Sequence, residues 1–86
     1  MEKELLCILK KYETHPDFLG DTIEDINQVG GMDDTVLHIA ARNNSLNDAL
    51  VFLQNGVLID LKGDLGYTPL HYACMFGNIE MVKLLL

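Results

Sequence analysis

The last twenty residues constrain the fold more than any other part of the chain. Thr68 can cap a helix through its hydroxyl, and Pro69 suits the first helical position because its missing N–H would be unpaired there anyway. Gly77 is placed to end that helix, and Asn78 to cap a second helix that runs to Leu86. The segment YTPLHYACMFGNIEMVKLLL therefore predicts two short antiparallel helices.

The same pattern occurs once more, 33 residues earlier. The residues that are identical at this spacing are Thr35, Leu37, His38, Ala40 and Leu53, which correspond to Thr68, Leu70, His71, Ala73 and Leu86. Val36 stands in place of the proline, and Asp33 stands where the later copy has the turn glycine Gly66. Because both substitutions remove residues suited to the turn, we expect the first turn of the earlier copy to be less regular.

The words T-P-L-H-x-A and G-N-x-E-x-V-K-L-L-L resemble the ankyrin repeat, which has a period of about 33 residues. The resemblance covers Gly31 to Leu86 well and the first thirty residues weakly. It implies an all-α fold, a solenoid of stacked antiparallel helix pairs with short hairpin-like finger loops. The expected units are an N-terminal capping unit, a degenerate repeat, at 1–30, a first repeat at 31–63 and a second, truncated at its C-terminal end, at 64–86.

The capping unit is expected to contain an amphipathic helix from Glu2 to Tyr12. Its apolar residues fall at helical spacing: Leu5, Ile8, Leu9 and Tyr12. His15-Pro16 and Gly20 mark a turn and the limit of a short second helix. A terminal repeat with a polar outer face is what a stacked array needs at its end.

The other end of the sequence is apolar. Leu84-Leu85-Leu86 closes the sequence inside a helix, without a polar closing repeat. Each unit of a stacked array buries one face on its neighbour. We therefore expect further repeats or another chain to cover the C-terminal end, and the alternative is a frayed helix that tolerates exposure.

Size and charge exclude several classes of function. A chain of 86 residues buries too little surface to build a deep catalytic cleft. The net charge of −7, with only six Lys and Arg, disfavours nucleic acid as a partner. No secretory segment and no run long enough to span a bilayer is present in the sequence. We expect a cytoplasmic protein that is not an enzyme and has no membrane partner.

His71 and Cys74, at positions i and i+3 of one helix, are the pair that could carry chemistry. A zinc site uses about four ligands, and no second pair of Cys or His has suitable spacing. Cys74 could also be a nucleophile with His71 as its base. It occupies the position of Ala41, however, so we expect it and Cys7 to be buried and inert. The sequence therefore predicts no catalytic residue, no metal and no cofactor.

The resemblance implies a structural role for the histidines instead. In ankyrin repeats this histidine bonds to the nearby threonine hydroxyl and to backbone groups that tie neighbouring repeats together. The residues expected to have structural roles are Thr35, His38, Thr68, Pro69, His71 and Gly77.

The resemblance also implies where a partner would bind. Ankyrin contacts usually come from the finger tips and from the exposed side of the first helix of each repeat, which line a concave groove. The residues at these places are Met32, Asp34, Arg42, Asn43, Asp64, Leu65, Tyr67, Met75 and Phe76. Aromatic and Met side chains are the usual anchors of protein interfaces. The alternative for Met75 and Phe76 is that they pack beneath a missing neighbour.

Seven carboxylates lie in a stretch without any Lys or Arg: Glu13, Asp17, Asp21, Glu24, Asp25, Asp33 and Asp34. This stretch is either a solvated face or a means of steering a basic partner. We expect a protein–protein interaction module that binds a partner, with a basic surface, through the concave groove. The alternatives are a dedicated inhibitor that neutralises a toxin or enzyme, and a purely structural capping part of a longer array.

Overall fold

The computed structural model of the chain describes residues 3–19 and 21–86. Glu2 and Gly20, where the sequence predicts the limits of helices, lie outside the described residues. The elements in chain order are α1 (Lys3–Tyr12), the 3-10 helix η1 (Pro16–Phe18), α2 (Val36–Asn43), α3 (Leu46–Gln54), the 3-10 helix η2 (Asp64–Gly66), α4 (Pro69–Met75) and α5 (Ile79–Leu85). No β-strand occurs in these residues, and the predicted all-α class is confirmed.

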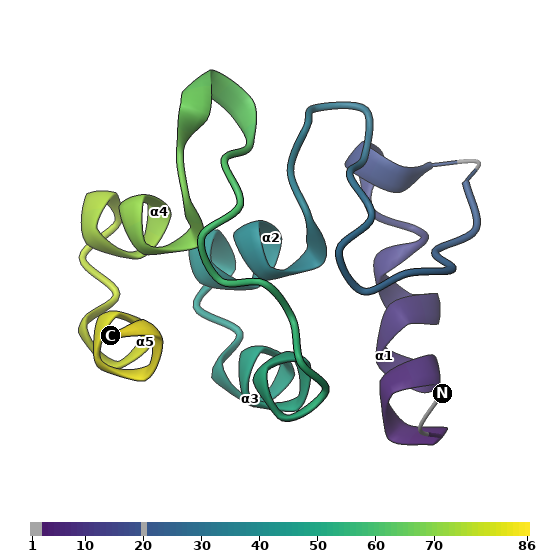
Figure 1. Cartoon of the computed structure of the whole chain (residues 1–86), viewed down its shortest axis with the longest axis horizontal. Coiled ribbons are helices and arrows are strands. Elements are labelled where there is room, and N and C mark those ends of the chain that lie inside the picture. The colour runs from purple at the N-terminus through teal and green to yellow at the C-terminus, as the bar shows by residue number, and fades with distance from the viewer. Residues whose placement is uncertain (1–2, 20) are drawn as a thin grey trace.

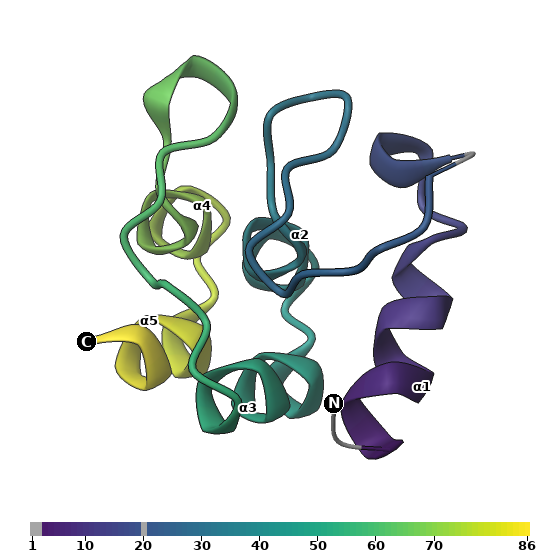
Figure 2. The same cartoon turned by 45° about the vertical axis from the view of Figure 1, so that its right-hand side comes forward.

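The helices form two layers, with loops that project from one of them (Figure 1). α2 and α4 lie side by side, and α3 and α5 form the second layer beneath them, as both views show (Figures 1 and 2). The two finger loops, residues 29–34 and 62–67, rise above α2 and α4 (Figure 2). Two antiparallel helix pairs thus stack side by side, as a repeat solenoid requires.

Local sequence accounts for the limits of α4. The Thr68 hydroxyl accepts the N–H of His71 at 3.3 Å, and Pro69 is the first helical residue. Gly77 follows the helix in a left-handed conformation, with φ of 68°. Asn44 takes the equivalent position after α2 with φ of 57°, which asparagine tolerates better than most residues do.

The finger loop of the earlier copy closes as regularly as that of the later one, so the irregularity expected at Asp33 is not found. Asp33 adopts φ of 66°, close to the 78° of Gly66. Each finger loop closes through one backbone hydrogen bond, from Gly30 N–H to the Asp34 carbonyl at 2.9 Å and from Gly63 N–H to the Tyr67 carbonyl at 2.7 Å. The loop therefore adopts the same closed form with an aspartate at a position where glycine would be less strained.

The N-terminal unit contains one α-helix rather than a pair. α1 stands steeply across the end of the stack, from the level of α3 to that of α2 (Figures 1 and 2). Its residues Leu5, Leu9 and Tyr12 are buried, and the Tyr12 ring meets Phe52 edge-on with centroids 5.5 Å apart. The short second helix is reduced to the 3-10 helix η1, which begins at Pro16 after the N-cap residue His15.

Both cysteines are exposed, contrary to the expectation that they would be buried. Cys7 lies on the outer side of α1. Cys74 lies on the side of α4 that faces away from α2, where the described residues provide no further helix to cover it. The position equivalent to Ala41 is buried only when a neighbouring pair packs against it.

Candidate functional site

Asp34 is fully buried between the two helix pairs, although the sequence placed it among the partner contacts. Its carboxylate accepts hydrogen bonds from the Tyr72 hydroxyl at 3.0 Å and from the Asp64 N–H at 2.9 Å. Arg42 Nη1 lies 3.5 Å from the same carboxylate. Asp34 is therefore unavailable to a partner, because α4 and the second finger loop cover it.

The Tyr72 hydroxyl is the partner of Asp34 that sequence reasoning missed. No role is assigned to Tyr72 on sequence grounds, although a buried tyrosine hydroxyl usually needs an acceptor. Burial, followed by the hydrogen bond to Asp34, raises the pKa of Tyr72 to about 12. The phenol therefore remains protonated and donates to the carboxylate throughout the physiological pH range.

His38 connects the first turn to the next finger loop. The Thr35 N–H donates to His38 Nδ1 at 3.1 Å, so the neutral ring carries its proton on Nε2. Nε2 donates in turn to the Tyr67 carbonyl at 2.9 Å. Burial lowers the pKa of His38 below its ordinary value of 6.5, although the Asp34 carboxylate opposes this effect. The neutral form is the one that fits this environment.

His71 makes the same local bonds in the second copy. The Thr68 N–H donates to its Nδ1 at 3.0 Å, and the Thr68 hydroxyl lies 2.7 Å from that atom. The side chain is exposed, and Nε2 has no hydrogen-bond partner among the described residues. Its neighbour Cys74 is also exposed, so the two residues do not form an enclosed site.

Six of the remaining predicted contact residues fall into two groups. Met32 and Leu65 occupy the finger tips, and Leu65 is 80 % exposed. The second group lies at or just beyond the C-terminal ends of α2 and α4: Arg42, Asn43, Met75 and Phe76. Because α4 has seven residues, these ends lie about 10 Å from the bases of the finger loops.

Three of the predicted contact residues also take part in packing. The Tyr67 ring meets Tyr72 edge-on, with centroids 5.7 Å apart, and Tyr67 is half-buried. Asp64 is half-buried, and its backbone N–H donates a hydrogen bond to the Asp34 carboxylate. The Arg42 guanidinium lies over the Tyr72 ring at 5.4 Å, and its side chain is 30 % exposed. These residues can contact a partner only with part of their surface.

The acidic stretch is less exposed than its sequence suggests. Asp17 and Asp34 are buried, and the half-buried Glu13 accepts the Ile23 N–H at 2.9 Å. One oxygen of Asp17 has no hydrogen-bond partner in the part of the chain that is described. The carboxylates that remain exposed are Asp21, Glu24, Asp25 and Asp33.

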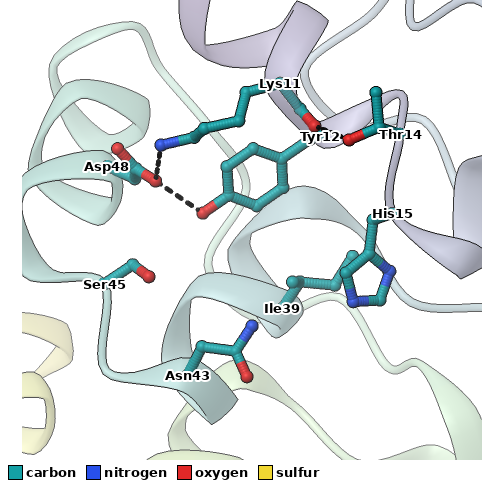
Figure 3. Close-up of a pocket in the computed structure, with 8 residues that line it drawn as sticks. All are labelled: Lys11, Tyr12, Thr14, His15, Ile39, Asn43, Ser45 and Asp48. Carbon is teal, nitrogen blue, oxygen red and sulfur yellow. Dashed lines mark hydrogen bonds and ion pairs between the residues drawn. The ribbon is translucent and has the colours of Figure 1, made fainter.

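A cleft of about 210 Å³ lies where α1 meets α2 and α3 (Figure 3). At one side of it, Tyr12 and Lys11 both point to Asp48, with distances of 2.8 Å and 3.0 Å to the same carboxylate oxygen. Burial, with the bond to Asp48, raises the pKa of Tyr12. Asp48, which lies on α3, thus fastens α1 to α3.

Residues 3–19 and 21–86 contain no group of three His, Cys, Asp or Glu side chains that could hold a metal ion. The helices formed by these residues are too short or too polar to cross a membrane.

Comparisons with known proteins agree with this architecture. The chain matches the family model described as ankyrin repeats, three copies, over residues 3–86. A stretch of 63 residues is 43 % identical to Palmitoyltransferase ZDHHC13 of Mus musculus, and covers 72 % of this chain and 10 % of that protein. A stretch of 59 residues is 39 % identical to Palmitoyltransferase ZDHHC17 of Rattus norvegicus, and covers 67 % of this chain and 10 % of that protein.

The chain spans about a tenth of the length of the curated relatives it matches. Ankyrin repeats are non-catalytic modules that generally bind other proteins, and their stacking creates a concave binding surface. The match over residues 3–86, the stacked helix pairs and the two Thr-x-x-His turns lead to one conclusion. The chain belongs to the ankyrin-repeat family.

Proposed function

We propose that this protein binds another protein through its groove surface, which we define as the two finger tips with the C-terminal ends of α2 and α4. The observation that carries the proposal is the exposure of large apolar side chains there. Leu65 is 80 % exposed, Met75 53 % and Phe76 55 %. Met and aromatic residues are enriched at protein interfaces, and a few well-packed anchor residues supply most of the binding energy.

Exposed apolar residues also occur elsewhere, so the groove surface needs a matched control. Leu50 on α3 and Leu58 in the following connector are 44 % and 55 % exposed. Single apolar residues on a surface are common and carry no function by themselves. The proposal therefore predicts that the Met75 and Phe76 side chains matter to binding, whereas those of Leu50 and Leu58 do not.

The charge of the protein supports a partner with a basic surface. Asp21, Glu24, Asp25 and Asp33 remain exposed and add to a net charge of −7. Such a field raises the association rate of a positively charged surface and weakens as salt is added. Contacts of the groove surface, to which Met32, Asn43 and Leu65 also belong, would then determine how tightly the partner is held.

The test uses the full chain immobilised on a support and extracts of its native source. Wild type is compared with a Met75→Ser, Phe76→Ser variant and with a Leu50→Ser, Leu58→Ser control, and circular dichroism checks that all three are equally helical. A partner retained by wild type and by the control, and lost by the groove variant, is the expected result. Its affinity should fall at least about 30-fold when the two anchors are removed.

Retention by the groove variant together with loss by the control would contradict the proposal and place binding on the α3 side. The steering effect is tested separately by stopped-flow mixing with the identified partner at several salt concentrations. The association rate should fall as salt rises, while the dissociation rate changes little. An association rate that is independent of salt would exclude a steering role for the exposed carboxylates.

A further inference from the structure

The cleft between α1, α2 and α3 already holds a cation at one edge (Figure 3). The Lys11 ammonium lies 3.0 Å from one oxygen of the Asp48 carboxylate and 5.6 Å from the centroid of the Tyr12 ring. A carboxylate beside an aromatic ring is a combination that attracts cations in proteins. The contacts of Lys11 therefore show which chemistry this corner of the cleft accepts.

Lys11 is an exchangeable occupant of this corner. Its side chain is 63 % exposed, whereas that of Asp48 is only 14 % exposed. The ammonium can return fully to water at little cost, because it is already largely hydrated. The Tyr12 hydroxyl donates to the same carboxylate at 2.8 Å and continues to hold α1 on α3. Lys11 can thus leave Asp48 without opening the junction of the two helices.

The Asp48 carboxylate offers more than Lys11 uses. The hydrogen bonds from Lys11 and Tyr12 both go to Oδ2, and Oδ1 accepts none from residues 3–19 and 21–86. A guanidinium group presents two parallel N–H donors that match both oxygens of a carboxylate, which an ammonium group does not. Asp48 is therefore better suited to an arginine than to the lysine that it contacts.

The space beside Asp48 suits one long side chain. The volume of the cleft, about 210 Å³, exceeds the roughly 150 Å³ of a protein cavity that accommodates benzene. Ile39 and the Tyr12 ring provide apolar walls for the methylene groups of an arginine, and the Ser45 hydroxyl points into the open space (Figure 3). The exposed Asn43 lines the cleft and also belongs to the groove surface. A partner on the groove surface can therefore reach the cleft.

We propose that the cleft binds an arginine side chain of the partner protein, whose guanidinium displaces Lys11 from Asp48 and pairs with both carboxylate oxygens. This inference rests on the proposed function, because it assigns one anchoring residue to the basic surface of the partner. The net charge of −7 favours a cation at this site. Arginine is also one of the residue types that most often supply the binding energy of protein interfaces.

The first test titrates the full chain with the blocked tripeptide Ac-Gly-Arg-Gly-NH2 and with its lysine and citrulline counterparts, while NMR follows the backbone amides. Citrulline keeps the shape of arginine without its charge. The arginine peptide should give saturable shifts at Ser45 and Asp48, with an affinity at least about fivefold higher than that of either counterpart. The absence of saturable shifts, equal binding of the citrulline peptide, or shifts spread evenly over the exposed carboxylates would overturn the proposal.

Two substitutions should change this affinity in opposite directions. Asp48→Asn removes the charge of the acceptor and should weaken binding of the arginine peptide at least about fivefold. Lys11→Ala removes the competing ammonium and should strengthen binding about threefold, a gain that unfolding cannot produce. Lys10→Ala is the matched control, because Lys10 is exposed on the same helix and does not line the cleft. Equal effects of the two lysine substitutions would contradict displacement of Lys11 and indicate a general effect of charge.

The partner captured in the pull-down provides the second test. Its affinity should fall at least about fivefold in Asp48→Asn and rise in Lys11→Ala. A partner that is lost by the Met75→Ser, Phe76→Ser variant but bound equally by wild type and Asp48→Asn would support the proposed function and overturn the arginine site. The peptide titration needs no partner, so it decides whether the cleft binds arginine even if the groove surface binds nothing.

Discussion

The two Thr-x-x-His turns have the same local geometry and different surroundings. In both, a threonine N–H donates to histidine Nδ1 at 3.0–3.1 Å, and the threonine caps the helix with φ near −90°. His38 is nevertheless fully buried and reaches the next finger loop, whereas His71 is exposed. Local sequence determines how the turn closes, and the neighbouring pair determines what the histidine contributes to stability.

The finger loops differ in a similar way. The first is anchored to the preceding unit by a main-chain oxygen, since Gly31 N–H donates to the Asp17 carbonyl at 2.6 Å. The second is anchored by a side chain, because the equivalent N–H, that of Asp64, donates to the Asp34 carboxylate. The Gly31 N–H therefore has a backbone acceptor, which no side-chain substitution removes. The acceptor of the Asp64 N–H is the buried Asp34 carboxylate, which a single substitution can remove.

Replacing that buried charge should have the largest effect. Asp34→Ala leaves the Tyr72 hydroxyl and the Asp64 N–H without their acceptor, and should lower the free energy of unfolding by about 3 to 4 kcal/mol. Asp64→Ala is the matched control, expected to cost no more than about 0.5 kcal/mol. Urea denaturation of both variants measures the difference. Equal losses would mean that the second finger loop does not depend on the carboxylate of Asp34.

The histidines provide the next test. His38→Ala removes a buried side chain that bonds to two segments, and should cost about 2 to 3 kcal/mol. His71→Ala removes an exposed side chain that bonds only within its own turn, and should cost less than about 1 kcal/mol. Thermal melts compare the two. If His71→Ala costs as much as His38→Ala, the local cap rather than the neighbouring pair is the source of stability.

Gly63 tests how closely the two pairs approach. A Cβ at position 63 would overlap Asp34 Oδ1 and lie 3.0 Å from His38 Nε2, so Gly63→Ala should cost about 2 kcal/mol. A Cβ at Gly66 would have no neighbour within 4 Å, and only its positive φ opposes the substitution. Gly66→Ala should therefore cost about 1 kcal/mol. Differential scanning calorimetry of both variants checks this order, and the reverse order would show that the loop can move away from His38.

The lowered pKa of His38 predicts a dependence on pH. Below its ordinary value of 6.5, the unfolded chain binds a proton on this ring that the folded chain does not bind. The free energy of unfolding is therefore highest, as far as His38 is concerned, above pH 6.5. It decreases as the pH falls from 6.5 toward the pKa of His38 in the folded protein. Urea denaturation at about pH 7.5 and about pH 5.5 should show this loss in wild type and not in His38→Gln. His71→Gln is the control and should keep the loss.

The smallest effect is expected at the first finger loop. Asp33 adopts φ of 66° where the second loop has glycine, so Asp33→Gly should stabilise the protein by about 0.5 to 1 kcal/mol. The variant also removes one exposed carboxylate, so a control for the loss of charge is needed. Asp21→Gly does not serve, because Asp21 does not share the positive φ of Asp33. Asp33→Asn keeps the side-chain shape and should change stability by less than Asp33→Gly does. A loss of stability in Asp33→Gly would contradict the comparison of the two loops.

Much of the fold could be predicted from sequence because its signals are local. Thr68, Pro69 and Gly77 determine where α4 begins and ends through their own hydrogen bonds and backbone angles. The 33-residue period then places a second pair of helices beside the first. The N-terminal unit was predicted less well, since the orientation of α1 depends on the contact between Tyr12 and Asp48, residues 36 positions apart.

The candidate site was harder to predict because exposure is a tertiary property. Asp34 is polar and lies in a finger loop, two features that suggest a surface residue. It is buried because α4 and the second finger loop cover it, and Tyr72 supplies a hydrogen bond to its carboxylate. Cys74 has the sequence position of a buried alanine, and it is exposed because the face on which it lies is uncovered. Periodicity identifies equivalent positions, but it does not show which of them have a neighbour.

The two tyrosine–aspartate pairs allow unfolding to be followed at two separate places in the molecule. The chain has three tyrosines and no tryptophan, so its near-ultraviolet spectrum arises almost entirely from tyrosine. Tyr12 sits at the junction of α1 with α3, and Tyr72 at the junction of the two helix pairs, each with its hydroxyl on a carboxylate. Tyr12→Phe and Tyr72→Phe would each remove the tyrosine signal of one junction. The near-ultraviolet signal that remains would show, during heating, whether the two junctions are lost at the same temperature or one after the other.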